Sequence, residues 1–152
     1  TQAIVILALS LGGLLTALGI LPALLSGIKD TLTTSGRAIF AAAMSALSIN
    51  VLIGEQYLSI LLSGTAFRST FERLHLHPKN LSRTIEDAGT VINPLVPWSV
   101  CGVFISQALG VPVLDYLPYA FFCYLSLLLT LLFGFTGLTI SRVKEGTAPQ
   151  NQ

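Results

Sequence analysis

Long stretches without a charged side chain alternate with short clusters of polar residues along this chain. No Asp, Glu, Lys or Arg occurs in residues 1–28, 88–114 or 116–141. Each stretch is longer than the roughly 20 residues that an α-helix needs to cross the hydrocarbon core of a bilayer. A soluble domain can bury one such helix in its core, but not a series of them. The pattern therefore predicts an all-α, polytopic membrane protein.

Polar turns and prolines divide the chain into four predicted segments, at residues 2–28, 38–62, 84–110 and 116–140. The hydrophilic residues 64–83 are predicted to connect the second segment to the third. We assign residues 1–141 to one membrane domain of three to four transmembrane or hairpin helices. Residues 142–152 are predicted to form a polar C-terminal tail.

Composition supports this assignment and excludes other classes of protein. Apolar residues make up 53% and charged residues 10% of the 152 residues, whereas soluble domains carry about 25% charged residues. The net charge is +1 and no basic stripe occurs, so we expect no nucleic acid partner. Cys101 and Cys123 lie in apolar runs, where cysteine is a small packing residue. We expect neither a cofactor nor an enzyme, because no cofactor motif, metal-ligand spacing or Ser/His/Asp arrangement occurs.

The second segment has polar residues in its middle, at Asn50, Glu55 and Gln56. If all four segments cross the membrane, six of the eight basic residues lie on one side and two on the other. If this segment instead turns back as a hairpin near residues 50–54, all eight share one side. Basic residues favour the cytoplasmic side, so the charge pattern slightly favours a hairpin with arms of about eleven residues.

The third segment is interrupted by Pro94 and Pro97. Each proline removes a backbone donor and clashes with the preceding turn of a helix. We therefore predict a broken helix with exposed backbone groups, which is stable at membrane depth only inside protein or beside a water-filled cavity. Broken helices of this kind coordinate the coupling ion in secondary transporters. A simple kink in a structural helix is the alternative.

Glu55 is the main candidate for ion chemistry. A carboxylate at the centre of a membrane helix costs about 2.5–3.5 kcal/mol to insert, and such residues often mark ion pathways. A carboxylate that has lost its hydration binds a proton more readily, so one site can exchange a proton for a cation. Asn50 and Gln56 are candidates because they lie close to it in the sequence. The alternative is that Glu55 pairs with a basic residue elsewhere in the protein or lies near the membrane interface.

Polar residues around the predicted break form the second candidate group. Thr90, Asn93 and Ser99 would supply oxygen ligands, which a hard cation such as Na⁺ prefers. Glu86 and Asp87 are predicted to open the third segment, where acidic residues stabilise a helix N-terminus. For Asp87 a second interpretation is open, in which it lines the cavity that leads to the break.

Two strings resemble a known family. Residues 50–60, Asn-Val-Leu-Ile-Gly-Glu-Gln-Tyr-Leu-Ser-Ile, resemble a stretch of the NhaC-type Na⁺/H⁺ antiporter family in which an acidic residue precedes Gln-Tyr-Leu-Ser-Ile. The resemblance continues in order and spacing over nearly the whole chain, through residues 81–98, 101–102, 109–112 and 116–122. The sequence departs from the family pattern at Glu55, where Asp is common, at Ala88, often Ser, and at Ser99, often Asn.

The resemblance implies a multi-pass protein of the bacterial inner membrane, surrounded by lipid, that exchanges Na⁺ for H⁺. Other members of the family exchange malate and protons for lactate and sodium. Members are much longer than this chain and are similar to transporters built from two inverted repeats, so the second and third segments would be the hairpin and broken helix of one repeat. We expect the chain to be the C-terminal part of such a transporter, and leave open whether it forms a homo-oligomer.

Three functional hypotheses follow from these residues and this resemblance. The first is Na⁺/H⁺ antiport at a site that contains Glu55 and the break at residues 93–97. The second is exchange of organic anions, whose carboxylates would bind at the N-termini of half-helices. The third is a non-transporting membrane scaffold, in which the polar residues only pair between helices.

Overall fold

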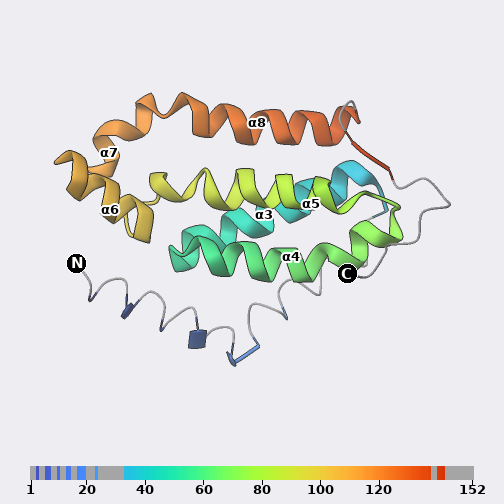
Figure 1. Ribbon diagram of the computed structural model, residues 1–152, viewed down its shortest axis with the longest axis horizontal. Coiled ribbons are helices and arrows are strands. Elements are labelled where there is room, and N and C mark those ends of the chain that lie inside the picture. The colour runs from blue at the N-terminus through green and yellow to red at the C-terminus, as the bar shows by residue number, and fades with distance from the viewer. Residues whose placement is uncertain are drawn as a thin grey trace.

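The computed structural model describes residues 33–137 and 140–142, together with single positions between residues 3 and 23. Within these ranges the regular secondary structure is helical, apart from one isolated β-bridge, which confirms the predicted all-α class. The first predicted segment, at residues 2–28, and the tail after Arg142 lie largely or wholly outside the described residues. Helices are numbered as in Figure 1.

The second predicted segment is a helical hairpin. Helix α3 (Ser35–Ile53) and helix α4 (Gln56–Arg73) pack side by side and run in opposite directions (Figure 1). The chain turns between them at Gly54, whose φ of 73° lies in the left-handed region. Glycine adopts this conformation without a steric penalty. Glu55 follows with an extended backbone and starts α4.

Small residues let the two arms of the hairpin approach closely. The Ser59 hydroxyl donates to the Ala46 carbonyl at 2.6 Å, and the Ser45 and Ser63 hydroxyls lie 3.2 Å apart. Small residues at helix interfaces favour such close packing in membranes. Buried alanines continue this face of α3 at positions 38, 42, 43 and 46.

The hairpin is longer than predicted. The prediction that residues 64–83 form a hydrophilic connection is wrong, because most of them are helical. Its arms have 19 and 18 residues, and only residues 74–77 separate α4 from the next helix. Charged residues suggested a loop, but they lie on the outer face of an amphipathic helix. Phe67 and Phe71 are buried on its inner face, whereas Arg68 and Glu72 form an exposed ion pair at 3.0 Å.

The third segment is a broken helix, as predicted. Helix α5 (Pro78–Ile85) continues through the π-helical turn η1 (Glu86–Thr90) and the 3₁₀ turn η2 (Asn93–Leu95), and the chain then bends by 44° into α6 (Val100–Leu109). The segment starts six residues earlier than predicted, since His77 caps α5 and Pro78 stands at its first position. Proline is favoured there because its missing N–H is not needed.

The fourth segment returns along the bundle. Helix α7 (Val113–Tyr116) and the 3₁₀ turn η3 (Leu117–Tyr119) lead through a bend of 57° into α8 (Phe121–Thr136). Figure 1 shows α6 and α7 at one end of the molecule and α8 running back above α5. Helix α3 is long and apolar enough to cross a membrane alone, and each bent helix pair of the described residues qualifies as one broken span.

Helices α3 and α8 cross where Gly36 of α3 meets Gly134 of α8. This close crossing gives a first testable prediction. A Cβ atom on Gly134 would lie 2.8 Å from Cγ2 of Ile39, and Ile39 is stiff because it is β-branched. We expect Gly134→Ala to lower the free energy of unfolding by about 1–3 kcal/mol. Thermal denaturation of the purified protein in detergent measures this change.

The matched control is Gly64→Ala, inside α4. Its added Cβ would meet only Cδ1 of Ile85, at an ordinary 3.4 Å. Alanine is the better helix former, so this variant should be as stable as the parent or slightly more stable. Equal melting temperatures for the two variants would contradict the tight α3–α8 crossing.

Candidate functional site

The turn of the hairpin and the break in the third segment lie against each other. The Val100 amide donates to the Gly54 carbonyl at 3.0 Å, and Nε1 of Trp98 donates to the Val51 carbonyl at 2.7 Å. There is no room for a side chain at the turn, because a Cβ on Gly54 would lie 3.0 Å from the Trp98 carbonyl oxygen. Two interruptions of helix that are far apart in the sequence therefore meet at one place.

Two buried asparagines join these interruptions. Asn93 donates its Nδ2 to Oδ1 of Asn50 at 2.5 Å, and Asn50 donates its own Nδ2 to the Gly89 carbonyl at 2.5 Å. Oδ1 of Asn93 accepts the Cys101 amide at 3.3 Å. Both side chains are 0% exposed, so each bond is made away from water. The two predicted candidates Asn50 and Asn93 are thus brought into direct contact.

Ser99 repairs the break that the prolines cause. Pro97 has no N–H for the Asn93 carbonyl, which accepts the Val96 amide at 3.1 Å and the buried Ser99 hydroxyl at 2.6 Å. The same hydroxyl oxygen accepts the Gly102 amide at 2.9 Å and so caps α6. The Tyr116 hydroxyl donates to the Pro94 carbonyl at 2.5 Å. Side chains thus replace the backbone partners that this segment lacks.

Glu55 lies at the edge of this cluster. It is half-buried, and its Oε2 accepts the Leu58 amide at 2.8 Å, so the carboxylate caps the N-terminus of α4. Gln56, also half-buried, lies near the break, with its Oε1 3.9 Å from the Cys101 sulfur. In the described part of the chain, no basic residue forms an ion pair with Glu55.

Glu86, Asp87 and Thr90 belong to the π-helical turn, and the prediction that the acidic pair opens a helix is wrong. The helical run begins eight residues before Glu86, at Pro78. Glu86 is exposed, and Asp87 contacts α8, where Ser126 and Thr130 donate to its carboxylate. Thr90 is half-buried and follows Gly89, the acceptor of the Asn50 bond.

The structure thus groups five of the eight predicted residues at the turn and the break: Asn50, Glu55, Gln56, Asn93 and Ser99. Thr90 adjoins the group through Gly89, and the structure does not bring Glu86 or Asp87 into it. Sequence reasoning missed Gly89, whose carbonyl carries no sequence signal, and the hydroxyls on α8. Ser126 and Thr130 could have been found from the sequence, because two hydroxyl residues four apart in an apolar helix share one face.

The group is chemically suited to a hard monovalent cation. The amide oxygen of each asparagine accepts one hydrogen bond in this structure, and an amide oxygen has two lone pairs. The carboxylate of Glu55 supplies a formal negative charge nearby. Among the described residues, no three His, Cys, Asp or Glu side chains are grouped as a metal site would require.

A model of the Na⁺/H⁺ antiporter family matches residues 1–138. The chain belongs to this family. It is 48% identical to the Na⁺/H⁺ antiporter NhaC of Alkalihalophilus pseudofirmus over 91% of the chain and 30% of that protein. It is 44% identical to NhaC of Bacillus subtilis over 87% of the chain and 29% of that protein.

Another relative is named for different substrates. The chain is 44% identical to the arginine/ornithine antiporter ArcD of Halobacterium salinarum, over 86% of the chain and 27% of that protein. These relatives are named as antiporters and not as enzymes. The chain spans about 30% of the length of the NhaC relatives it matches. No solved structure matches it.

Proposed function

We propose that the chain forms part of the transport core of a Na⁺/H⁺ antiporter in a bacterial inner membrane. Na⁺ binds where the hairpin turn meets the break, and Glu55 exchanges the cation for a proton. The observation that carries the proposal is the contact between the two interruptions through the buried Asn50–Asn93 pair. Interrupted helices that meet in this way are typical of ion sites in secondary transporters.

The distribution of charge supports placement of this site inside the membrane. Figure 1 shows that α3 begins, α4 ends and α5 begins at the end of the bundle opposite the hairpin turn. The described basic residues belong to these parts of the chain and to the residues after α8: Arg37 near the start of α3, Arg68 and Arg73 toward the end of α4, Lys79 and Arg83 in α5, and Arg142. From the basic end, residues 38–53 and 56–67 carry no charge and, at a rise of about 1.5 Å per residue, cover about 24 Å and about 18 Å. A hydrocarbon core is about 30 Å thick, so the turn would lie deep inside it.

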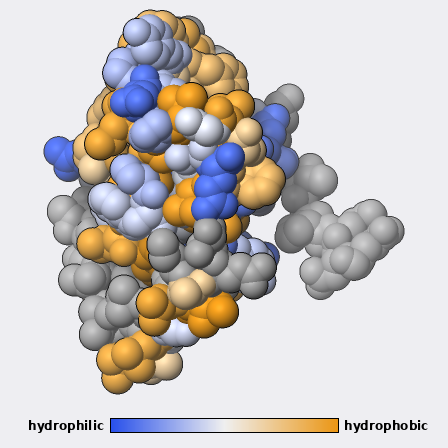
Figure 2. Space-filling view, turned by 90° about the vertical axis from the view of Figure 1, so that its left-hand side faces the viewer, coloured by the Kyte–Doolittle hydropathy of each residue, from blue (hydrophilic) through white to orange (hydrophobic). Residues whose placement is uncertain are grey.

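The outer surface fits the same placement. Helix α8 exposes large apolar side chains along its length at Phe121, Phe122, Leu125, Leu128 and Phe135. Lipid or neighbouring helices would cover them. Figure 2 looks onto the end of the bundle that holds the hairpin turn, α6 and α7, where hydrophobic and hydrophilic residues are interspersed.

In the proposed cycle, protons and Na⁺ compete for one site. Oδ1 of Asn50 and of Asn93, with the hydroxyl of Ser99, the side chain of Gln56 and the carbonyls near Thr90, would surround the cation, and Glu55 would balance its charge. Protonation of Glu55 removes that charge, and the affinity for Na⁺ then falls. The protonated and Na⁺-bound forms would therefore alternate across the membrane.

The capping of the half-helices favours a cation over an organic anion at this site. A substrate carboxylate would bind at a helix N-terminus. The carboxylate of Glu55 already caps α4, and the Ser99 hydroxyl caps α6. An anion would meet a filled position and the negative charge of Glu55. Counterflow of labelled lactate, malate or arginine, with and without Na⁺, would test whether such a cargo is also carried.

The proposal predicts the effect of Glu55→Gln in the protein expressed from its complete gene. Glutamine keeps the size of the side chain and an oxygen that can accept the Leu58 amide, but it cannot exchange a proton. We expect Na⁺-dependent collapse of the proton gradient in everted vesicles to slow at least roughly tenfold, the factor that accompanies about 1.4 kcal/mol of lost binding. The amount of folded protein should not change.

Glu72→Gln is the control, because Glu72 is exposed near the basic end and forms an ion pair with the exposed Arg68. It should exchange ions at the parent rate. Undiminished exchange by Glu55→Gln would remove Glu55 from the mechanism.

A further inference from the structure

The π-helical turn η1 makes contacts on two sides within a few residues. The Gly89 carbonyl accepts Nδ2 of Asn50 from the hairpin. Two residues earlier, the carboxylate of Asp87 accepts the hydroxyls of Ser126, at 2.6 Å, and Thr130 from α8. One short turn therefore connects α8 to the asparagine pair at the proposed ion site.

The α8 hydroxyls are the main partners of Asp87. Ser126 donates to Oδ1 and Thr130 to Oδ2, so each carboxylate oxygen has one donor. The remaining charged neighbour, Arg83, has its Nε 4.0 Å from Oδ2, and its side chain is 53% exposed and lies over the Phe133 ring. The Asp87 side chain is only 16% exposed. Hydrogen bonds to a charged group are stronger than those between neutral groups, so this contact fixes the side chain firmly.

The wide turn makes this contact relevant to the ion site. In η1 the Val91 amide bonds to the Glu86 carbonyl, five residues back, at 3.1 Å. An α-helix would bond four residues back, and the change of register would rotate Asp87 and Gly89 relative to their partners. Isolated π-turns are rare and have to be stabilised by their surroundings. Here Asp87 and Gly89 are both held from outside the turn, on α8 and on α3.

We propose that Ser126 and Thr130 are positioning residues of the ion site, which act through Asp87 and η1 to hold the Gly89 carbonyl against Asn50. This inference rests on the proposed function, since it assigns α8 a part in the same cation site. Neither hydroxyl contacts the asparagine pair directly. Their loss should therefore change how well the site binds Na⁺ rather than remove a ligand.

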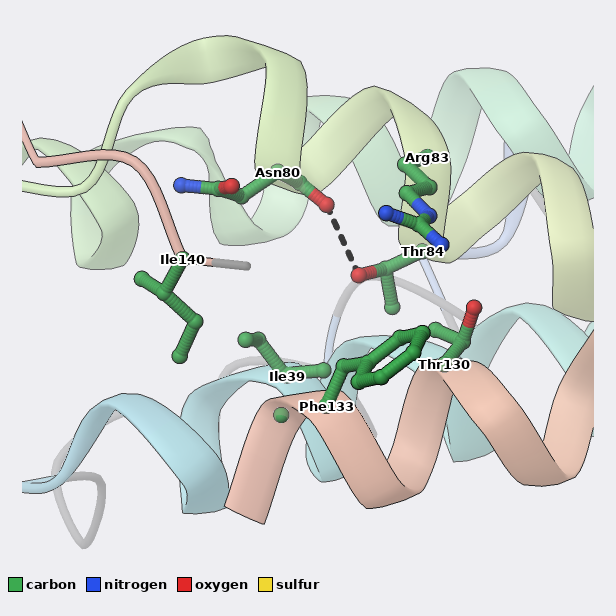
Figure 3. Close-up of a pocket in the computed structure, with 8 residues that line it drawn as sticks. Ile39, Asn80, Arg83, Thr84, Thr130, Phe133 and Ile140 are labelled. Carbon is green, nitrogen blue, oxygen red and sulfur yellow. Dashed lines mark hydrogen bonds between the residues drawn. The ribbon is translucent and has the colours of Figure 1, made fainter. Parts of the chain in front are cut away.

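Helix α8 has other anchors, so loss of the two hydroxyls should not detach it. Near its C-terminal end, Gly134 packs on Ile39. Just beyond the helix, Asn80 donates to the Ser141 carbonyl at 2.6 Å and accepts the Ser141 amide at 3.2 Å. Figure 3 shows Phe133 and Thr130 of α8 facing Arg83 and Thr84 of α5. These side chains line a cavity of about 20 Å³.

The test compares two double variants of the protein expressed from its complete gene. In Ser126→Ala with Thr130→Val both hydroxyls are lost, and we expect the Na⁺ concentration for half-maximal exchange to rise roughly three- to thirty-fold with little change in maximal rate. In Ser126→Thr with Thr130→Ser both hydroxyls remain, and parent behaviour is expected. Thr136→Val is the control on the same helix, because its exposed hydroxyl donates to the Leu132 carbonyl within that helix.

An unchanged half-maximal concentration in the hydroxyl-free variant would overturn the proposal. Equal losses in both double variants would also overturn it, because packing rather than the hydroxyls would then be responsible. Protection of Cys101 from a maleimide by Na⁺, with every other cysteine replaced, measures cation binding without transport. If Na⁺ protects Cys101 but no exchange occurs, the antiport proposal fails. The Na⁺ concentration that gives half-maximal protection, compared between the parent and the double variants, then still tests the positioning role of Ser126 and Thr130. If Na⁺ gives neither exchange nor protection in the parent, both proposals fail.

Discussion

Replacing Asn50 with alanine is expected to destabilise the protein by about 2–6 kcal/mol and to abolish Na⁺-dependent exchange. The change leaves two buried polar groups without their partners, the Gly89 carbonyl and Nδ2 of Asn93. Each unsatisfied buried group costs roughly 1–3 kcal/mol. It also separates the hairpin from the broken helix at the proposed ion site. Thermal denaturation in detergent and gradient collapse in everted vesicles measure the two effects.

Asn80→Ala provides a comparison at the opposite end of the bundle. Asn80 is also buried and makes two hydrogen bonds to Ser141, so its loss should reduce stability. Because Asn80 is remote from the hairpin turn, the remaining folded protein should keep the parent affinity for Na⁺. An Asn50→Ala protein that binds Na⁺ as the parent does would show that the asparagine pair is purely structural.

A methyl group on Gly102 is expected to be the most disruptive small change in the broken helix. Its Cβ would lie 2.2 Å from the Val96 carbonyl oxygen and 3.0 Å from Oγ of Ser99. The first of these is a backbone atom, which cannot rotate away. We expect Gly102→Ala to cost at least about 3 kcal/mol, at the upper end for overpacking. The yield of folded protein and its melting temperature in detergent are the measurements.

Gly64→Ala again serves as the control, since it adds the same methyl group to a helix without a clash. If Gly102→Ala had the same melting temperature as Gly64→Ala, the Val96 carbonyl could not lie as close to α6 as described. If Gly102→Ala folded but exchanged no Na⁺, the damage would be confined to the break, which would strengthen the assignment of the site to this region.

The sequence predicted the interruptions well because their causes are local. Pro94 and Pro97 break a helix wherever it lies. The hairpin was less well determined, since the distribution of basic residues along the whole chain only slightly favoured a turn near residues 50–54 over a full span. The extent of α4 could not be predicted in the same way. Residues 64–73 carry charges that suggest a loop, and only the buried partners of Phe67 and Phe71 explain why they are helical.

The candidate site was predicted in part for the same reason. Asn50, Asn93 and Ser99 stood out because amides and hydroxyls are unusual in apolar segments. Their pairing depends on the crossing of two helices, which no local pattern encodes. Asp87 was misplaced because an acidic residue after a polar stretch is typical of a helix start. Its actual partners lie about forty residues further along the chain.

Two of the bonds that hold the hairpin turn use only backbone carbonyls of the turn itself. The Val100 amide binds the Gly54 carbonyl, and Trp98 binds the Val51 carbonyl, so neither bond uses a side chain of the turn itself. Side chains at Val51 and Leu52 remain exposed and can be replaced without undoing the attachment. Substitutions at these two positions can therefore change the chemistry around the turn while both backbone attachments are kept.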